Sequence, residues 1–257
     1  MSQFLKTKYL GRTLCLEEST ASTNNLAKQL GRQDAPNGLL VLAEEQTGGK
    51  GRIGRGWTSP KGKGLWFSIL LRPSFSPEDA PKCTLMAAVA VVEAINSCGG
   101  IEARIKWPND ILFEKKKMVG ILSEMSAEYG KLHYVVIGIG LDTHVEKEDL
   151  PEDVSPIAVS LHQVATKEFT REELLGQILN NLEILVDEAQ ERGFGEIFHR
   201  WRKLNCTLGE KVRVIAQDET YPGMALDIDD NGHLLVQREN GQVAAVVAGD
   251  VSIRYAN

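Results

Sequence analysis

The sequence predicts an α+β fold in two parts, strands and helices over residues 1–207 and a small β-barrel over residues 208–257. In the first part, short apolar runs typical of strands alternate with longer stretches of helical periodicity. In the second part, from about Gly209, five short strand-like runs follow one another between Asn-Gly turns, as in small barrels. This change of pattern predicts a domain boundary.

The expected elements can be given in chain order. In the first part we expect strands at residues 14–16, 38–43, 65–71, 104–113, 118–124 and 132–141, and helices at residues 25–30, 77–96, 170–185 and 194–204. Thr170 opens the third helix with a capping box, and Pro108 makes the centre of the fourth strand a bulge or a strand end. The barrel strands are expected at residues 211–215, 224–228, 233–237, 243–247 and 251–255.

Composition limits the class of protein. The chain has 257 residues, 42% of them hydrophobic, which is enough for a real core. Its net charge of −6 argues against a general nucleic-acid binder, which usually carries a basic excess. The four cysteines and five histidines show neither Cys-x-x-Cys nor His-x-x-x-His spacing, so we expect no zinc site and no disulfide framework. Without a signal-peptide pattern or a membrane-length apolar run, the expected location is the cytoplasm.

The most informative stretch is QTGGKGRIGRGW, from Gln46 to Trp57. Residues 48–56 hold five glycines and three cations, with Ile53 as the single apolar anchor. Backbone N–H groups and alternating charges suit a phosphate, and such a loop is expected to be mobile when empty. The plain alternative is a solvated surface loop.

Lookalike motifs fit this stretch less well. It matches G-x-G-x-x-G literally, but turn residues follow it where a nicotinamide dehydrogenase needs a helix. It lacks the Ser or Thr after Gly-Lys that a Walker motif requires, and the Val that a kinase glycine loop requires. An RNA-binding Gly/Arg module is disfavoured by the acidic net charge.

Other polar residues stand where they could reach the same ligand. Ser22, Thr23 and Asn24 stand at a helix N-terminus, where one cap needs only one of them. Asn109 and Asp110 follow Pro108 in a turn or at a strand end. Lys117 is the last of three lysines and opens a strand, although such a cluster is usually a solvated turn. Gly138 and Gly140 lie on one strand face and permit close approach of a flat ligand or another backbone.

In this order the motifs resemble those of the biotin–protein ligases (biotin–[acetyl-CoA-carboxylase] ligases) over nearly the whole chain. The matching segments are Ser22-Thr23-Asn24, Gln46 through Trp57, Lys106 to Asp110, Lys117 to Leu122, and Gly138 with Gly140. The resemblance implies a mixed sheet related to class II aminoacyl-tRNA synthetases, followed by an SH3-like barrel. It also implies that biotin and MgATP form biotinyl-5′-AMP, which acylates one lysine of a biotin carboxyl carrier protein.

The resemblance also implies roles for individual residues. Lys117 would be the essential cation between the biotin carboxylate and the α-phosphate, and Arg52 would act with it from the closing loop. Ser22, Thr23 and Gln46 would bind the ureido ring, Gly138 and Gly140 would let it lie against the strand, and Asn109 and Asp110 would line the phosphate side. The expected biotin and adenylate site comprises Ser22, Thr23, Asn24, Gln46, Gly49, Lys50, Gly51, Arg52, Asn109, Asp110, Lys117, Gly120, Leu122, Gly138 and Gly140. No metal ligand is assigned to the protein, since Mg²⁺ would arrive with ATP near Asp110.

The chain departs from the family pattern at two positions. Lys50 stands where the common motif has arginine, and Asp142 stands where family members usually have asparagine. Ser22 comes too early for the N-terminal helix-turn-helix of some members, so no sequence-specific DNA binding is expected. Homodimers built by joining sheets occur in this family. The nearest rival function is that of a lipoate–protein ligase, whose arginine-rich segment and triple glycine are absent from this sequence.

Overall fold

The computed structural model describes residues 2–216, 219–248 and 252–255, which fold around a seven-stranded mixed sheet with the strand order β1-β2-β3-β7-β6-β5-β4. β1 and β2 are parallel, and the other neighbours are antiparallel. The strands are β1 Leu14–Glu17, β2 Leu39–Ala43, β3 Gly64–Leu71, β4 Arg104–Lys106, β5 Asp110–Phe113, β6 Lys116–Glu128 and β7 Lys131–Asp142. Pro108 therefore falls between two short strands, as the sequence predicts.

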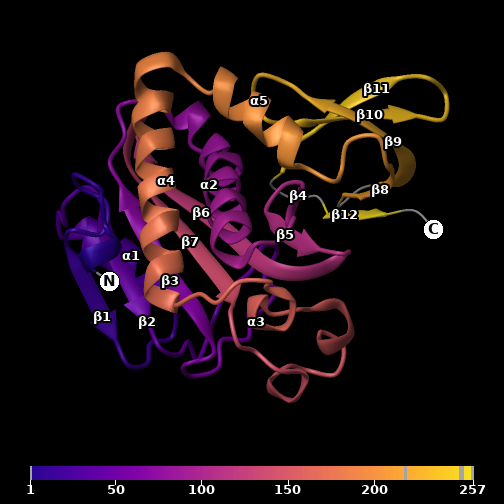
Figure 1. The fold of residues 1–257 in the computed structure, drawn as a ribbon. Coiled ribbons are helices and arrows are strands. Elements are labelled where there is room, and N and C mark those ends of the chain that lie inside the picture. Colours follow the sequence, from indigo (N-terminus) through magenta and orange to yellow (C-terminus); the bar gives the residue numbers. More distant parts are fainter. Residues whose placement is uncertain (1, 217–218, 249–251, 256–257) are drawn as a thin grey trace.

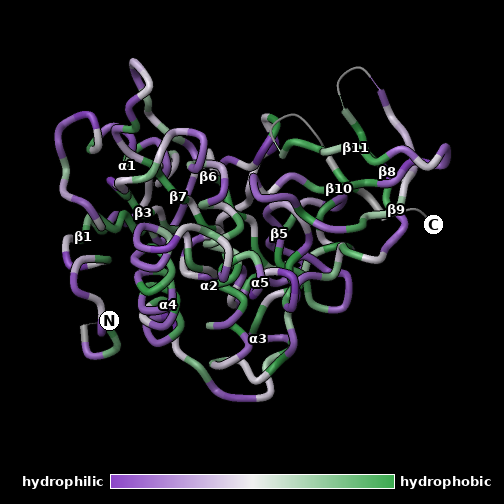
Figure 2. The backbone as a smooth tube through the Cα atoms, turned by 90° about the horizontal axis from the view of Figure 1, so that it is seen from above, coloured by the Kyte–Doolittle hydropathy of each residue, from purple (hydrophilic) through white to green (hydrophobic). Residues whose placement is uncertain are grey.

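Helices cover both faces of the sheet. α2 and α4 lie against one face, and α1 packs on β2, β3 and β7 on the other (Figure 1). The helices are α1 Thr23–Arg32, α2 Lys82–Gly99, α3 Leu161–Val164, α4 Arg171–Arg192 and α5 Gly195–Leu204. The tube in Figure 2 is largely hydrophobic along α2, whereas α4 alternates between hydrophobic and hydrophilic residues. The main core therefore lies between the α2 side of the sheet and these two helices.

Local signals account for the ends of the long helices. The N–H of Glu173 donates to Thr170 Oγ1 at 3.1 Å, so the predicted cap of α4 is confirmed. The expected helix over residues 77–96 was wrong at both ends. Pro77–Asp79 form a separate 3₁₀ turn, and α2 begins only after Pro81, which has no backbone N–H to donate to a helical hydrogen bond. α2 is long and apolar enough to cross a membrane, but 67% of it is buried inside the protein, as befits a core helix.

The C-terminal part is a five-stranded antiparallel sheet with the order β11-β10-β9-β8-β12. Its strands are β8 Lys211–Ile215, β9 Thr220–Ile228, β10 Leu234–Arg238, β11 Val243–Val246 and β12 Ser252–Tyr255. In Figure 1 this sheet lies beside β4 and β5, at the end of the molecule opposite β1. The buried indole of Trp107 donates to Gly232 O at 3.1 Å, and its backbone N–H donates to Thr207 Oγ1 at 2.9 Å. These bonds fix the small sheet to the loop between β4 and β5.

Candidate active site

A cavity of about 140 Å³ lies over one face of β6 and β7, between α1, the loop between β4 and β5, and the glycine-rich segment. Of the residues predicted for the site, all but Gly49 line it, together with Trp57, Lys106 and Ile253. Its charged lining residues are Lys50, Arg52, Arg55, Lys106, Lys117 and Asp110. Of the residues that the structure describes, five cations and one carboxylate therefore line this space, in a chain whose net charge is −6. Such a site favours an anionic ligand.

We call residues 48–56 the flap. Its chain doubles back, because Lys50 and Gly56 form an antiparallel bridge and the Gly51 N–H donates to Arg55 O at 2.7 Å. Ile53 and Gly54 at the tip have positive φ angles of 55° and 69°, the left-handed backbone of a tight hairpin turn. The expectation that Ile53 anchors the loop is wrong, because that side chain is 55% exposed at the tip. Ordered backbone bonds, rather than apolar burial, shape the flap.

Gly49 forms the neck of the flap and is not among the residues that line the cavity. Its carbonyl accepts a hydrogen bond from the N–H of Trp57 at 2.9 Å. A Cβ at position 49 would lie only 2.3 Å from Trp57 O, so the two chains can approach this closely only with glycine. Gly49 therefore has a structural role in the flap, and its part in binding stays a prediction.

Arg52 links the flap to two other parts of the chain. Its guanidinium donates to Asn109 Oδ1 at 3.0 Å and to the carbonyl of Ala248, just after strand β11 of the small sheet. Asn109 is itself held to β6, since its Nδ2 donates to Ile121 O at 2.9 Å and its carbonyl accepts from Ile121 N at 3.0 Å. Asn109, which the sequence places on the phosphate side of the site, therefore also positions Arg52.

Lys117 lies inside β6 and projects into the cavity from its floor. Its Nζ is 2.6 Å from Asp110 Oδ1 and lies 5.0 Å from the centroid of the Trp57 ring. The hairpin tip before it consists of Glu114 and Lys115, both with positive φ, so Lys117 is fixed by the strand that follows. An ion pair and a cation–π contact hold this ammonium group in place, about one third exposed.

Asp110 is also the residue near which the sequence predicts magnesium. Among the described residues, its carboxylate is the only one in the lining of this cavity, and it is paired with Lys117. Within residues 2–216, 219–248 and 252–255, no three His, Cys, Asp or Glu side chains gather into a metal-binding group. This donor set fits Mg²⁺ carried mainly by the phosphates of a nucleotide, with one carboxylate nearby, better than a resident metal.

Three glycines on β6 and β7 make room for side chains of this chain. A Cβ on Gly140 would lie 2.3 Å from Trp57 Nε1, and one on Gly120 would lie 2.8 Å from the same ring. A Cβ on Gly138 would lie 2.0 Å from Asn24 Oδ1. Contact of a flat ligand with Gly138 and Gly140 stays a prediction, and both glycines line the cavity. Asn24 and Trp57 cover these glycines, and the cavity lies beside and above them.

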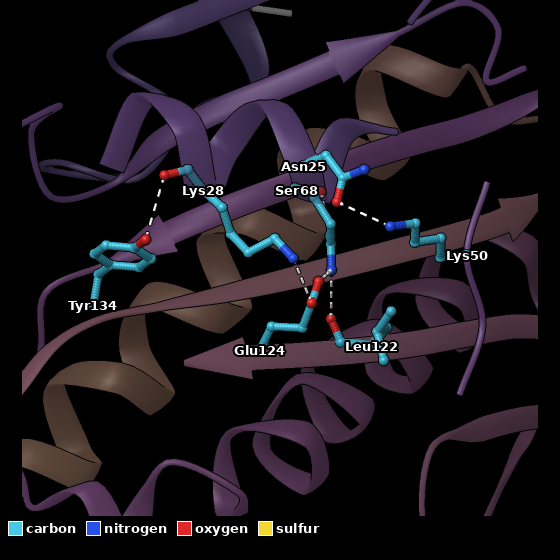
Figure 3. Close-up of polar contacts among 8 residues, drawn as sticks. Asn25, Lys28, Lys50, Ser68, Leu122, Glu124 and Tyr134 are labelled. Carbon is cyan, nitrogen blue, oxygen red and sulfur yellow. Dashed lines mark hydrogen bonds and ion pairs between the residues drawn. The ribbon is translucent and has the colours of Figure 1, made fainter. Parts of the chain in front are cut away.

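Asn24 belongs to a polar network that the sequence did not reveal, and its partners Ser68, Leu122 and Glu124 are labelled in Figure 3. Its Nδ2 donates to Leu122 O at 3.2 Å and to Glu124 Oε2 at 2.9 Å, and its Oδ1 accepts from Ser68 Oγ at 2.6 Å. Lys28 Nζ completes the network at 2.5 Å from Glu124. Burial raises the pKa of Glu124, but the bonds from Lys28 and Asn24 outweigh it and leave that pKa below its usual value. The hydrogen-bonding capacity of Asn24 is thus largely used in positioning α1.

Gln46 and Thr23 are already connected to each other at the other side of the cavity. The backbone N–H and the hydroxyl of Thr23 donate to Gln46 Oε1 at 2.9 and 3.1 Å, and Gln46 Nε2 donates to Ser59 Oγ at 2.9 Å. Ser22 is the N-cap of α1, yet its side chain makes no capping bond. The expectation that one of these side chains caps α1 is therefore wrong. Ser22, Thr23 and Gln46 line the cavity instead.

Comparison with known proteins places the chain in a family. Residues 16–142 match the model of the biotin/lipoate A/B protein ligase family, and residues 207–254 match the biotin protein ligase C-terminal domain. The bifunctional ligase/repressor BirA of Bacillus spizizenii is 38% identical over 249 residues, which are 97% of this chain and 76% of that protein. The biotin–[acetyl-CoA-carboxylase] ligase of Mycobacterium tuberculosis is 31% identical over 247 residues, covering 93% of this chain and 88% of that one.

A solved structure gives the same result. The biotin protein ligase of Aquifex aeolicus in complex with biotin and ATP superposes with a TM-score of 0.81 at 27% identity, covering 95% of this chain and all of that one. Fold and sequence agree in both parts of the chain. The protein belongs to the biotin–protein ligase family.

Proposed function

We propose that this chain uses ATP to activate biotin as biotinyl-5′-AMP and then transfers the biotinyl group to a lysine of a biotin carrier protein. In the first step a carboxylate oxygen of biotin bonds to the α-phosphorus and pyrophosphate leaves. In the second, the ε-amine of the acceptor lysine bonds to the acyl carbon, loses a proton, and AMP leaves. The first step brings two anions together, the carboxylate of biotin and the phosphates of ATP, and the cation-lined cavity offsets their repulsion.

The observation that carries this proposal is the fixed position of Lys117 in the floor of the cavity. Asp110 and the Trp57 ring hold its ammonium group before any substrate arrives. A cation that is already positioned stabilises charge that develops on phosphorus without further reorganisation. We assign Lys117 to the junction between the biotin carboxylate and the α-phosphate, where it offsets the repulsion between them.

The flap supplies the second group of cations and excludes water. Lys50 and Arg52 lie in the same arm of its hairpin, and Lys50 contacts Asn25 of α1 whereas Arg52 contacts Asn109. An acyl-adenylate is a mixed anhydride that water hydrolyses, so a closed flap protects it until the acceptor amine enters. We assign these two cations to the phosphate of the adenylate. When bound, Mg²⁺ neutralises the phosphates of ATP next to Asp110.

The remaining assignments follow from the corner of the cavity formed by α1 and β2. Ser22, Thr23 and Gln46 present hydroxyl and amide groups to the cavity, which suits the ureido ring of biotin. In this proposal residues 1–207 carry out the chemistry in the cytoplasm. Residues 208–257 support it, because the small sheet holds Arg52 through Ala248 and Trp107 through Gly232.

Mass spectrometry tests this function directly. A biotin carrier domain is incubated with the protein, biotin and MgATP, and parallel samples omit ATP or replace biotin with lipoate. We expect a mass gain of one biotinyl group on a single lysine, dependent on ATP. A gain with lipoate and none with biotin would assign the chain to the lipoate branch of the matched family instead. No gain with either acid would refute the ligase proposal.

A further inference from the structure

A continuous chain of polar contacts leads from Glu124 on β6 to Thr23 at the start of α1. Glu124 Oε2 accepts from Asn24 Nδ2 at 2.9 Å, and Asn24 Oδ1 accepts from Ser68 Oγ at 2.6 Å. The same Ser68 oxygen lies 2.7 Å from Thr23 Oγ1. The three inner residues are between 0% and 4% exposed, so their hydrogen-bonding groups depend on one another. The direction of each bond in the chain is therefore constrained by its neighbours.

The direction of the chain is set at Glu124. Burial raises the pKa of Glu124, but the bonds from Lys28 and Asn24 leave it below its usual value. Its carboxylate is therefore ionised at neutral pH and can only accept. The carbonyl of Leu122, 3.2 Å from Asn24 Nδ2, can also only accept. Asn24 must turn its NH₂ group toward these two acceptors, which leaves its oxygen facing Ser68.

A hydroxyl group has a single proton, and this carries the direction along the chain. The Ser68 proton is needed at Asn24 Oδ1, so Ser68 Oγ acts as an acceptor toward Thr23. The Thr23 proton has two acceptors inside the protein, Ser68 Oγ at 2.7 Å and Gln46 Oε1 at 3.1 Å. Gln46 is itself oriented, because its Nε2 donates to Ser59 Oγ. At these two residues of the cavity lining, Thr23 Oγ1 and Gln46 Oε1 are therefore left to accept from a ligand.

We propose that Glu124 is a positioning residue that determines specificity: through this chain it makes the Thr23 hydroxyl an acceptor for an N–H group of the bound acid. The proposal rests on the proposed function, because the N–H groups of biotin are those of its ureido ring. In the reversed chain Asn24 donates to Ser68 and Ser68 donates to Thr23. That arrangement fills one acceptor position of Thr23 and frees its proton to oppose a ligand N–H. Glu124 touches no substrate and acts by excluding the reversed chain.

Calorimetric binding of biotin and of its cyclic-carbamate analogues, in which oxygen replaces one or the other ureido N–H, tests this role. Biotin and each analogue differ by one donor, so the ratio of their affinities reports on the acceptor in the protein. Wild type should prefer biotin to at least one analogue. Glu124→Gln should reduce that preference roughly fivefold to tenfold, the effect of one hydrogen bond, because the new amide keeps its oxygen on Lys28 and turns its NH₂ group toward Asn24. Glu128→Gln, at an exposed position of the same strand, is the matched control and should keep the wild-type ratio.

Removal of the competing donor should restore the preference. In Lys28→Met/Glu124→Gln the amide oxygen is released from position 28 and can accept from Asn24, so the affinity ratio should return to within about twofold of wild type. A merely structural role predicts an equal loss of affinity for all the acids in Glu124→Gln, and that result would refute the proposal. A double variant no better than Glu124→Gln, or a wild type without any preference, would refute it as well. If wild type binds no biotin and forms no adenylate, the proposed function itself fails; if it does both while the ratio is independent of Glu124, only this proposal fails.

Discussion

The two faces of the central sheet differ although the same strands build both. On the α2 side, paired positions of β6 and β7 carry large apolar side chains, such as Ile121 opposite Ile139. On the other side, the next pairs are Gly120 opposite Gly140 and Leu122 opposite Gly138. One face fills its space with its own side chains. The other leaves room that Asn24 of α1 and Trp57, the residue after the flap, fill.

This difference separates stability from chemistry. Each buried isoleucine on the α2 side contributes about 1.5–3 kcal/mol through burial alone. On the other face the missing side chains allow groups from distant segments to approach the backbone, so the charges of the site lie close to a rigid floor. Rigid strands hold positioned groups more accurately than loops do. We therefore expect substitutions on the site face to lower activity with little loss of stability. Substitutions on the α2 side should lower stability and leave the activity of the folded enzyme unchanged.

The largest expected effect is on the site face. Lys117→Ala should abolish adenylate formation, a loss of at least about a hundredfold to a thousandfold, because the cation between carboxylate and phosphate is gone. The fold should persist, since the side chain is one third exposed and packs in no core. Pyrophosphate release with biotin and MgATP measures the rate, and the exposed neighbour Lys116→Ala is the control. Normal adenylation by Lys117→Ala would remove Lys117 from its assigned role.

A pair of substitutions on β7 contrasts the two faces directly. Gly140→Ala places a methyl group within 2.3 Å of Trp57 Nε1, so the indole must leave Lys117, and activity should fall by roughly tenfold to a hundredfold with little change in Tm. Ile137→Ala empties part of the core and should cost about 2–5 kcal/mol of stability while the folded enzyme keeps its activity. Urea unfolding and adenylation rates on the same samples measure both. Equal losses of activity in both variants would refute the separation of the faces.

Much of this arrangement was predictable because its signals are local. The flap, the cap at Thr170 and the strand that carries Lys117 each follow from a few adjacent residues. The network of Lys28, Asn24 and Glu124 could not be predicted, because its partners are about a hundred residues apart and meet only through the sheet register. The position of Trp57 could not be predicted either, because its ring packs over Gly120 and Gly140. These two glycines lie on different strands and are paired only by the sheet register. The sequence marked Asp142 as a departure, but its burial depends on the tertiary fold.

The smallest expected effect concerns the flap, where the chain departs from the arginine of its family. Lys50 Nζ lies 3.3 Å from Asn25 Oδ1, so it already bridges the flap and α1 (Figure 3). Lys50→Arg should keep the rate of adenylate formation and slow adenylate release by about twofold to tenfold, because a guanidinium binds phosphate through two N–H groups. Release of preformed biotinyl-5′-AMP measures this, with Lys61→Arg in the exposed pair with Glu18 as the control. Unchanged or faster release would mean that Lys50 acts on α1 and not on the phosphate, and the flap would then retain the adenylate through Arg52.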